Sequence, residues 1–296
     1  MPRQRAVEAI LVLVLLFWRA NSAVAQDSGG RPRNIILIGW DGVQRNHLKE
    51  SLRRGELPNL EKLSAQGALV AIDILRTTST KPGYAQLLTG YEPETTGVFD
   101  NQRYQPIPKG YTIFERLEKF FGPDKFISAA VLAKKEELFG QGLDEITSGL
   151  YEDAKVGQGA LELLDKHKDK PFFFLIFFGQ TDFKGHAFGE NSKEYNAALI
   201  SADAWLGKIV RKLKDLGIYD QTLIYVTSDH GFDEGQKTHY DAPYIFLATN
   251  DPKVIRRGRR QDIAPTILSR FGLDLDTVQP PLDGHPLTQT YTEPKW

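Results

Sequence analysis

The chain alternates short, continuous apolar runs with longer segments whose apolar residues recur at helical spacing. Runs of five to eight apolar residues are typical of strands buried on both faces of a sheet. Strands are predicted over residues 34–39, 68–74, 126–132, 171–178, 222–226 and 243–248, and helices over 111–121, 154–166 and 195–216. Their alternation predicts an α/β fold with a mostly parallel central sheet and helices on both faces.

No change of composition, internal repeat or linker divides residues 33–290, so we expect one domain there. The segments between the predicted elements are short, notably within residues 91–170. They leave no room for a large cap domain.

The first residues differ in character from the rest of the chain. A basic start at residues 2–5, an apolar stretch at 9–18 and a small-residue site at 22–25 are typical of a cleaved secretory signal. Ten apolar residues are far fewer than the roughly 20 needed to cross a bilayer, which disfavours the alternative of a membrane anchor. We therefore predict a signal peptide over residues 1–25, a secreted or periplasmic protein, and no stable membrane span after cleavage.

Composition and charge exclude several classes of function. The net charge of -1 gives no reason to expect a nucleic-acid-binding patch. The chain contains no cysteine, which excludes disulfides and thiolate chemistry. Any metal must therefore be held by histidine and carboxylate side chains.

Aspartate and histidine residues gather where the predicted strands end. Ligands of open α/β sheets bind beyond the carboxyl ends of the strands. Each aspartate alone is more often a helix cap or turn former. Three aspartates and three histidines together at these places favour a metal site. Six ligands are too many for one Zn²⁺ and suit two divalent ions that share a substrate. The predicted ligands are Asp41, Asp182, His186, Asp229, His230 and His239.

Thr80 is the candidate nucleophile. It follows the strand predicted over 68–74, and Pro82 suits the first turn of a helix that runs to Thr89. The free N–H groups at such a helix start favour an anion, but a hydroxyl needs a metal or a base to ionise. The alternative is that Thr80 only caps the helix.

Taken in order, the motifs of residues 33–290 resemble those of the alkaline phosphatase superfamily, nearest its type I phosphodiesterase/nucleotide pyrophosphatase branch. They are Trp40-Asp41-Gly42, Thr80-x-Pro82 with Leu88-Thr89-Gly90 and Pro93, Asp182-x-x-Gly185-His186, Ser228-Asp229-His230-Gly231, and Asp262-Ile263-Ala264-Pro265-Thr266.

The resemblance implies a role for each predicted ligand. One metal would be held by Asp182, His186 and a late histidine, for which His239 is favoured over His285. The other metal would be held by Asp41, Asp229 and His230 and would also bind Thr80. The two divalent ions would be Zn²⁺, with Mn²⁺ as the alternative. His47 and His167 lie among charged residues of predicted helices, and we expect both to be solvated.

The sequence departs from the family pattern at one position beside the nucleophile. Gly83 stands where nucleotide-cleaving relatives have an asparagine, so Lys81 or Asn101 would have to supply the missing donor to the phosphoryl group. Sulfatases of the superfamily need a cysteine or serine at the nucleophile position, so Thr80 disfavours sulfatase chemistry. The basic run at residues 256–260 is expected to be a solvated loop rather than a phosphate-binding patch.

The hypothesis is an exported two-metal hydrolase that acts on a small phosphate ester through a phospho-threonine, with phosphodiester or pyrophosphate bonds favoured. Two alternatives stay open: a phosphomonoesterase or phosphoryl or phosphoethanolamine transferase using the same site, and an exported binding protein with a decayed site.

Overall fold

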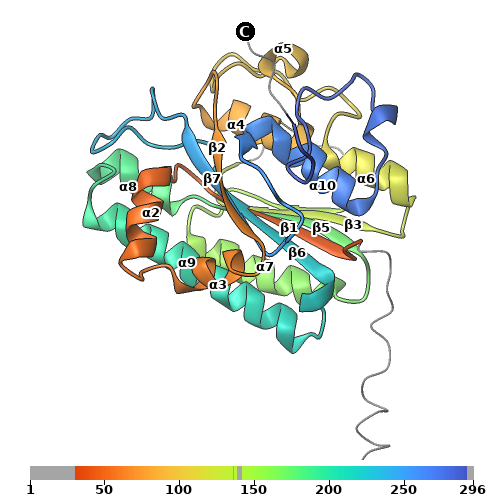
Figure 1. Ribbon diagram of the computed structural model, residues 1–296, viewed down its shortest axis with the longest axis horizontal. Helices are drawn as coiled ribbons and strands as arrows, with labels where there is room; N and C mark the ends of the chain where they lie inside the picture. Colours follow the sequence, from red (N-terminus) through yellow and green to blue (C-terminus); the bar gives the residue numbers. More distant parts are fainter. Residues whose placement is uncertain (1–30, 136, 139–141, 292–296) are drawn as a thin grey trace, which may run out of the picture. The chain divides into compact units, whose positions relative to one another are not determined.

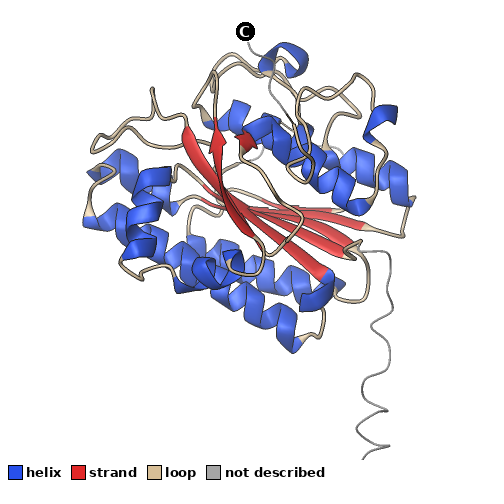
Figure 2. Cartoon of the chain, viewed as in Figure 1, coloured by secondary structure: helices blue, strands red, loops and turns tan. Residues whose placement is uncertain are grey.

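A computed structural model describes residues 31–135, 137–138 and 142–291 of the chain. The predicted signal peptide lies outside the described residues. The unit that follows it, Pro32–Trp296, is built on one eight-stranded sheet with the strand order β4-β3-β5-β1-β6-β7-β2-β8. Figure 2 shows this sheet in red between helices in blue. The strands are β1 (Asn34–Trp40), β2 (Ala68–Asp73), β3 (Ile127–Leu132), β4 (Glu145–Thr147), β5 (Phe172–Phe178), β6 (Thr222–Thr227), β7 (Tyr244–Thr249) and β8 (Gly258–Arg259).

Helices cover both faces of the sheet, as the apolar runs predict. In β1, Ile35 and Leu37 pack with α4, α6 and α10, whereas Ile36 and Ile38 pack with α2, α3, α7 and α9. Figure 1 shows these two groups of helices on opposite sides of the sheet. A strand that is buried on both sides has no polar face, which explains its unbroken apolar sequence. The helices are α2 (Arg45–Arg53), α3 (Pro58–Ser64), α4 (Thr80–Thr89), α5 (Pro93–Thr96), α6 (Ile113–Phe121), α7 (Asp153–His167), α8 (Gln180–Phe188), α9 (Lys193–Asp215) and α10 (Ile263–Phe271).

Strand direction decides which loops meet at one edge of the sheet. β1 pairs in parallel with β5 and β6, whereas β7 runs antiparallel to both β6 and β2. The beginning of β7 therefore lies at the same edge as the ends of β1, β2, β5 and β6. This arrangement brings the residues that precede β7 to the residues that follow the other four strands.

The predicted fold class is confirmed, and the six predicted strands are present within one or two residues. The short strands β4 and β8 were not predicted, since two or three residues give no periodicity to recognise. The described residues form no separate cap domain.

No helix within the described part of the chain combines the length and the apolar character needed to cross a membrane.

Two expectations about charged surface were wrong. His47 is only 8% exposed, and its Nδ1 lies 2.8 Å from Glu190 Oε1, because this face of α2 packs against the segment that joins α8 to α9. In the basic run, Arg260 is fully buried beneath the start of α4. His167 is half-buried, with Nε2 3.2 Å from Glu145 Oε2.

Candidate metal centre and nucleophile

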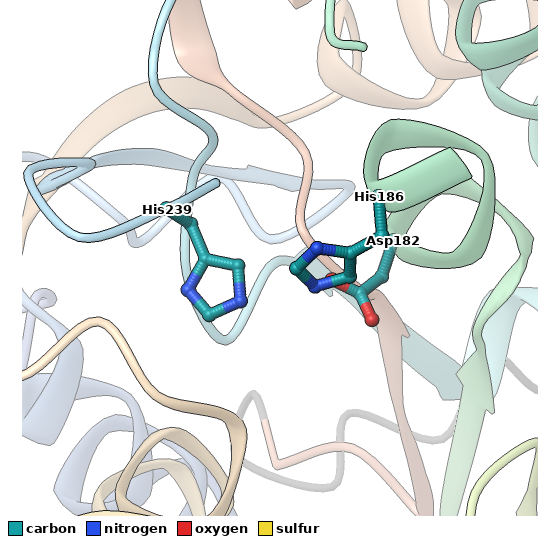
Figure 3. A group of neighbouring side chains, drawn as sticks. All are labelled: Asp182, His186 and His239. Atoms are coloured by element: carbon teal, nitrogen blue, oxygen red, sulfur yellow. The ribbon is translucent and has the colours of Figure 1, made fainter. Parts of the chain in front are cut away.

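Three predicted ligands form the first cluster. Asp182 and His186 lie four residues apart on α8 and so share one face of that helix, and His239 approaches from the loop before β7 (Figure 3). Ligand atoms of all three lie within 4.8 Å of one another. His186 Nε2 is 3.3 Å from Asp182 Oδ1. Two imidazoles and a carboxylate at this spacing match the donor set of a protein-bound Zn²⁺.

A second cluster adjoins the first. Asp41, Asp182 and His230 bring ligand atoms within 4.8 Å of one another, so Asp182 belongs to both groups. Asp229 lies beside this group, with Oδ2 3.5 Å from His230 Nε2. The sequence placed Asp229 rather than Asp182 with Asp41 and His230. All four are at most 3% exposed.

The orientation of His230 suits a ligand. Its Nδ1 lies 2.8 Å from the backbone oxygen of Gly231, which directs Nε2 toward the carboxylates. Nε2 is 3.3 Å from Asp41 Oδ1. This places the ring nitrogen that would bind a metal at the centre of the acidic group.

Lys134 pairs with one oxygen of Asp41 and one of Asp182, but other carboxylate oxygens of this group have no hydrogen-bond partner among the described residues. Asp41 Oδ1 and Asp229 Oδ2 are buried and accept no hydrogen bond from the described residues. An ionised carboxylate in that position is costly unless a cation lies beside it. The oxygen and nitrogen donors that meet here therefore fit divalent metal ions such as Zn²⁺ or Mn²⁺.

The titration of the site follows from the same crowding. Burial, together with the charge of Asp41, raises the pKa of Asp229 to about 7. Burial alone would lower the pKa of His230, but the nearby Asp229 and Asp41 raise it to about 9. Burial and the charge of His230 lower the pKa of His239 to about 4. A cation between these groups would relieve the repulsion among the carboxylates.

Thr80 lies at the edge of the second cluster. It is the first residue of α4, and the N-cap position belongs to Ser79, so capping does not explain Thr80. Its Oγ1 is 3.3 Å from His230 Nε2 and 3.3 Å from Lys134 Nζ. The hydroxyl therefore sits at a helix N-terminus and beside the ring nitrogen of a candidate metal ligand.

Lys134 was missed by the sequence analysis. Its Nζ lies 2.7 Å from Asp41 Oδ2 and 2.7 Å from Asp182 Oδ2. Burial would lower the pKa of Lys134, but the charges of Asp41 and Asp182 outweigh burial and raise the pKa. Lys134 follows the end of β3. A search for charged residues just beyond the strand ends, which found the aspartates, would also have found Lys134 if lysine had been included.

The two predicted substrate residues have different surroundings. Asn101 Oδ1 accepts a hydrogen bond of 2.9 Å from the backbone N–H of Lys81, which leaves Nδ2 as the donor that Asn101 offers. Lys81 Nζ pairs with Glu137 Oε2 at 2.6 Å and lies 3.2 Å from the centre of the Tyr104 ring. The ammonium of Lys81 is thus directed to Glu137.

The structure places His285 outside both clusters. Its ring stacks on Tyr291 at 3.9 Å, and its backbone N–H donates to Asp262. His239, by contrast, is held by its neighbours: Thr78 Oγ1 donates to its carbonyl oxygen, and Asp233 accepts from the Thr238 hydroxyl at 2.7 Å and from the backbone N–H of Tyr240 at 3.0 Å.

The presence of glycine at position 83, where the family pattern has asparagine, has a steric explanation. A Cβ on Gly83 would lie 2.7 Å from Asp229 Cβ and 3.2 Å from Arg260 Nη1. Arg260 donates to Gln86 Oε1 at 2.7 Å, to Thr77 O at 2.9 Å and to the carbonyl oxygen of Asp229. A buried guanidinium therefore fills this space and links the start of α4 to the backbone of a candidate ligand.

Comparison with known proteins places this geometry in a family. The family model described as type I phosphodiesterase/nucleotide pyrophosphatase matches residues 35–139 and 144–266. Ectonucleotide pyrophosphatase/phosphodiesterase family member 1 from Homo sapiens is 28% identical over 225 residues, which are 69% of this chain and 24% of that protein. The chain thus spans about a quarter of the length of this relative.

Solved structures share the fold. An inactive threonine-to-alanine form of murine ectonucleotide pyrophosphatase/phosphodiesterase 5, in complex with AMP, superposes with a TM-score of 0.66 at 13% identity and covers 81% of this chain and 95% of that one. A protein of the alkaline phosphatase superfamily from Vibrio parahaemolyticus gives a TM-score of 0.61 at 19% identity, with coverages of 89% and 71%. Because the family model matches most of the length of this chain, the chain belongs to the type I phosphodiesterase/nucleotide pyrophosphatase family.

Proposed function

We propose that the chain is an exported two-metal hydrolase that cleaves phosphate esters through a phospho-threonine on Thr80. The observation that carries this proposal is the position of Thr80 Oγ1, 3.3 Å from His230 Nε2 at the start of α4. Membership of a phosphodiesterase family supports a phosphoester hydrolase.

The two clusters define the residues that would hold the metals. Asp182, His186 and His239 would hold one ion, and Asp41, Asp229 and His230 the other, with Asp182 between them. When bound, two such ions supply positive charge that favours ionisation of a nearby hydroxyl and stabilises charge on phosphoryl oxygens. The donor set favours Zn²⁺, with Mn²⁺ as the alternative.

The protein's own groups define the covalent steps. Thr80 Oγ1 forms a bond to phosphorus as the ester P–O bond opposite breaks, and the ester oxygen leaves with the electron pair. The hydroxyl proton is released to solvent. The oxygen of a water molecule then bonds to phosphorus as the bond between phosphorus and Oγ1 breaks. One water proton returns to Oγ1, which restores the threonine hydroxyl, and the phosphoryl product leaves with the water oxygen.

Other groups orient the phosphoryl group during these steps. The first N–H groups of α4 have no partner within the helix and favour an anion at its start. Asn101 Nδ2 is the side-chain donor that replaces the asparagine lost at Gly83. Its orientation is fixed because its Oδ1 accepts from the backbone of Lys81.

The substrate class and the location follow from the family and the N-terminal sequence. The family favours phosphodiester or pyrophosphate bonds in a small substrate. The basic and apolar start of the chain supports export, as does the name of the ectonucleotide relative.

A substrate panel with Thr80 variants tests the proposal. Wild-type protein supplied with Zn²⁺ should release 4-nitrophenol from mono-aryl or bis-aryl phosphates, and Thr80→Ala should lose nearly all turnover while metal content and melting temperature persist. Thr80→Ser should keep part of the rate because it keeps the oxygen. Thr80→Ala with wild-type turnover would contradict the covalent route.

A further inference from the structure

A buried glutamate outside both metal clusters holds the loop that carries His239. Glu190 lies between α8 and α9 and is only 2% exposed. Its Oε2 accepts a hydrogen bond of 3.0 Å from the backbone N–H of Gly235, and its own backbone N–H donates to Gln236 O at 2.9 Å. The side chain and the backbone of Glu190 thus bind two consecutive residues of the segment 233–239, which we call the His239 loop.

The other carboxylate oxygen of Glu190 is held from two helices. Glu190 Oε1 lies 2.8 Å from His47 Nδ1, and His47 Nε2 lies 3.2 Å from Asn196 Oδ1. His47 belongs to α2 and Asn196 to α9. A buried carboxylate is costly unless its oxygens have partners, and each oxygen of Glu190 has one. The carboxylate therefore connects the His239 loop to the helices beneath it.

The His239 loop also orients a second candidate ligand. His186 Nδ1 lies 2.9 Å from Lys237 O. A carbonyl oxygen can only accept, so Nδ1 carries the proton and Nε2 is left to bind a metal. Lys237 Nζ donates to Ala187 O at 2.8 Å, which holds the same stretch of loop against α8. The ring centres of His186 and His239 lie 5.0 Å apart, so the position of one loop affects both imidazoles of the first cluster (Figure 3).

We propose, on the basis of the two-metal site described above, that Glu190 is a positioning residue for the metal ion of the first cluster. Glu190 would not bind the ion. It fixes residues 235 and 236, and the loop in turn sets the positions of His239 and of the carbonyl oxygen that orients His186. No candidate ligand of the second cluster lies on this loop, so removal of Glu190 should weaken the binding of one ion.

Metal titration tests this role without turnover. Metal-free wild-type protein should bind two Zn²⁺ in competition with a chromophoric chelator. Glu190→Ala should weaken one site by about 10- to 100-fold, the effect typical of residues that orient a metal ligand, and should leave the other within about 3-fold. Glu190→Gln should stay close to wild type, because its amide can accept from Gly235 and donate to a neutral His47.

Two further variants separate positioning from a general loss of stability. Glu190→Asp keeps the charge but is one carbon shorter, too short to contact both partners without a backbone shift, so it should also weaken one site. It carries the test if Glu190→Ala does not fold. Asp203→Ala removes another buried carboxylate, which accepts from the backbone N–H groups of Asn59 and Leu60 at the start of α3. This control should lower the melting temperature and leave both Zn²⁺ sites unchanged.

Amide hydrogen exchange measures the loop directly in metal-free protein. Peptides that cover residues 233–239 should exchange faster in Glu190→Ala and Glu190→Asp than in wild type, and at the wild-type rate in Asp203→Ala. Two unchanged Zn²⁺ sites in the Glu190 variants, or equal weakening of both sites, would overturn the assignment. Wild-type protein that binds fewer than two Zn²⁺ would instead contradict the proposed two-metal site, and the exchange rates would then decide whether Glu190 holds the loop.

Discussion

Gly83→Ala should damage activity more than stability, because the added methyl group would press α4, which carries the proposed nucleophile Thr80, against the proposed metal ligand Asp229. The new Cβ would lie 2.7 Å from Asp229 Cβ and 2.9 Å from Asp229 O. Ordinary van der Waals contact begins near 3.4 Å, so α4 and the Asp229 backbone must separate by about 0.7 Å. Thr80 begins the same helix three residues earlier and would move with it.

Two opposing effects set the size of the stability change. Overpacking of a buried site costs about 1–3 kcal/mol. Alanine in place of glycine inside a helix recovers about 1 kcal/mol. The net loss should therefore be about 0–2 kcal/mol. A misplacement near 1 Å at a reacting group lowers rates by about 100-fold, so kcat/KM should fall by about 10- to 100-fold.

The assay combines turnover, melting temperature and metal content on one preparation. Gly159→Ala is the control. Gly159 lies on α7, a helix that supplies no candidate ligand, and an added Cβ would lie 3.0 Å from Val131 Cγ1. The control should change melting temperature without changing kcat/KM. Wild-type turnover in Gly83→Ala, with metals retained, would refute the close coupling between α4 and Asp229.

Three further predictions concern a candidate ligand, the loop that carries it, and a buried ion pair elsewhere in the fold. His239→Ala should lower the metal content measured by atomic emission, whereas His285→Ala should not, and the reverse outcome would reassign the ligand. Asp233→Ala should weaken metal affinity by about 10-fold in a competition titration because it frees the loop around His239, with Asp241→Asn as the control that should match wild type. Burial would lower the pKa of His47, but the hydrogen bond and charge of Glu190 raise it, so this pair adds stability that is complete below about pH 6.5 and lost as pH rises through the folded pKa. The free energy of unfolding from urea titrations at pH 6 and pH 9 should therefore differ less in His47→Gln than in wild type, and an equal difference would exclude His47 as the source.

The sheet could be predicted from the sequence because its central strands are buried on both faces, so that each appears in the sequence as a continuous run of apolar residues. The edge strands β4 and β8 could not, because they are too short to form such a run. The direction of β7 could not be predicted either, although it explains why His239 precedes a strand while Asp41, Asp182 and Asp229 follow strands.

The structure brings the predicted ligands together, since placement at strand ends requires only the topology of the sheet. Contacts that depend on side-chain packing escaped prediction. Nothing in the sequence distinguishes Lys134 from other lysines that follow a strand. Its role becomes apparent only from its 2.7 Å contacts with Asp41 and Asp182. Arg260 belongs to a basic run typical of a solvated loop, and its burial depends on the space above Gly83 and on its hydrogen bonds to Gln86 and Thr77.

The stereochemical course at phosphorus tests the covalent role of Thr80 most directly. A phosphodiester made chiral at phosphorus by oxygen isotopes would be turned over by the metal-loaded protein in water that carries a third oxygen isotope, and the configuration of the phosphomonoester product would be determined by NMR. Attack by Thr80 followed by attack of water requires two in-line displacements, so we expect retention of configuration. Inversion would mean a single displacement by water and would contradict a phospho-threonine intermediate.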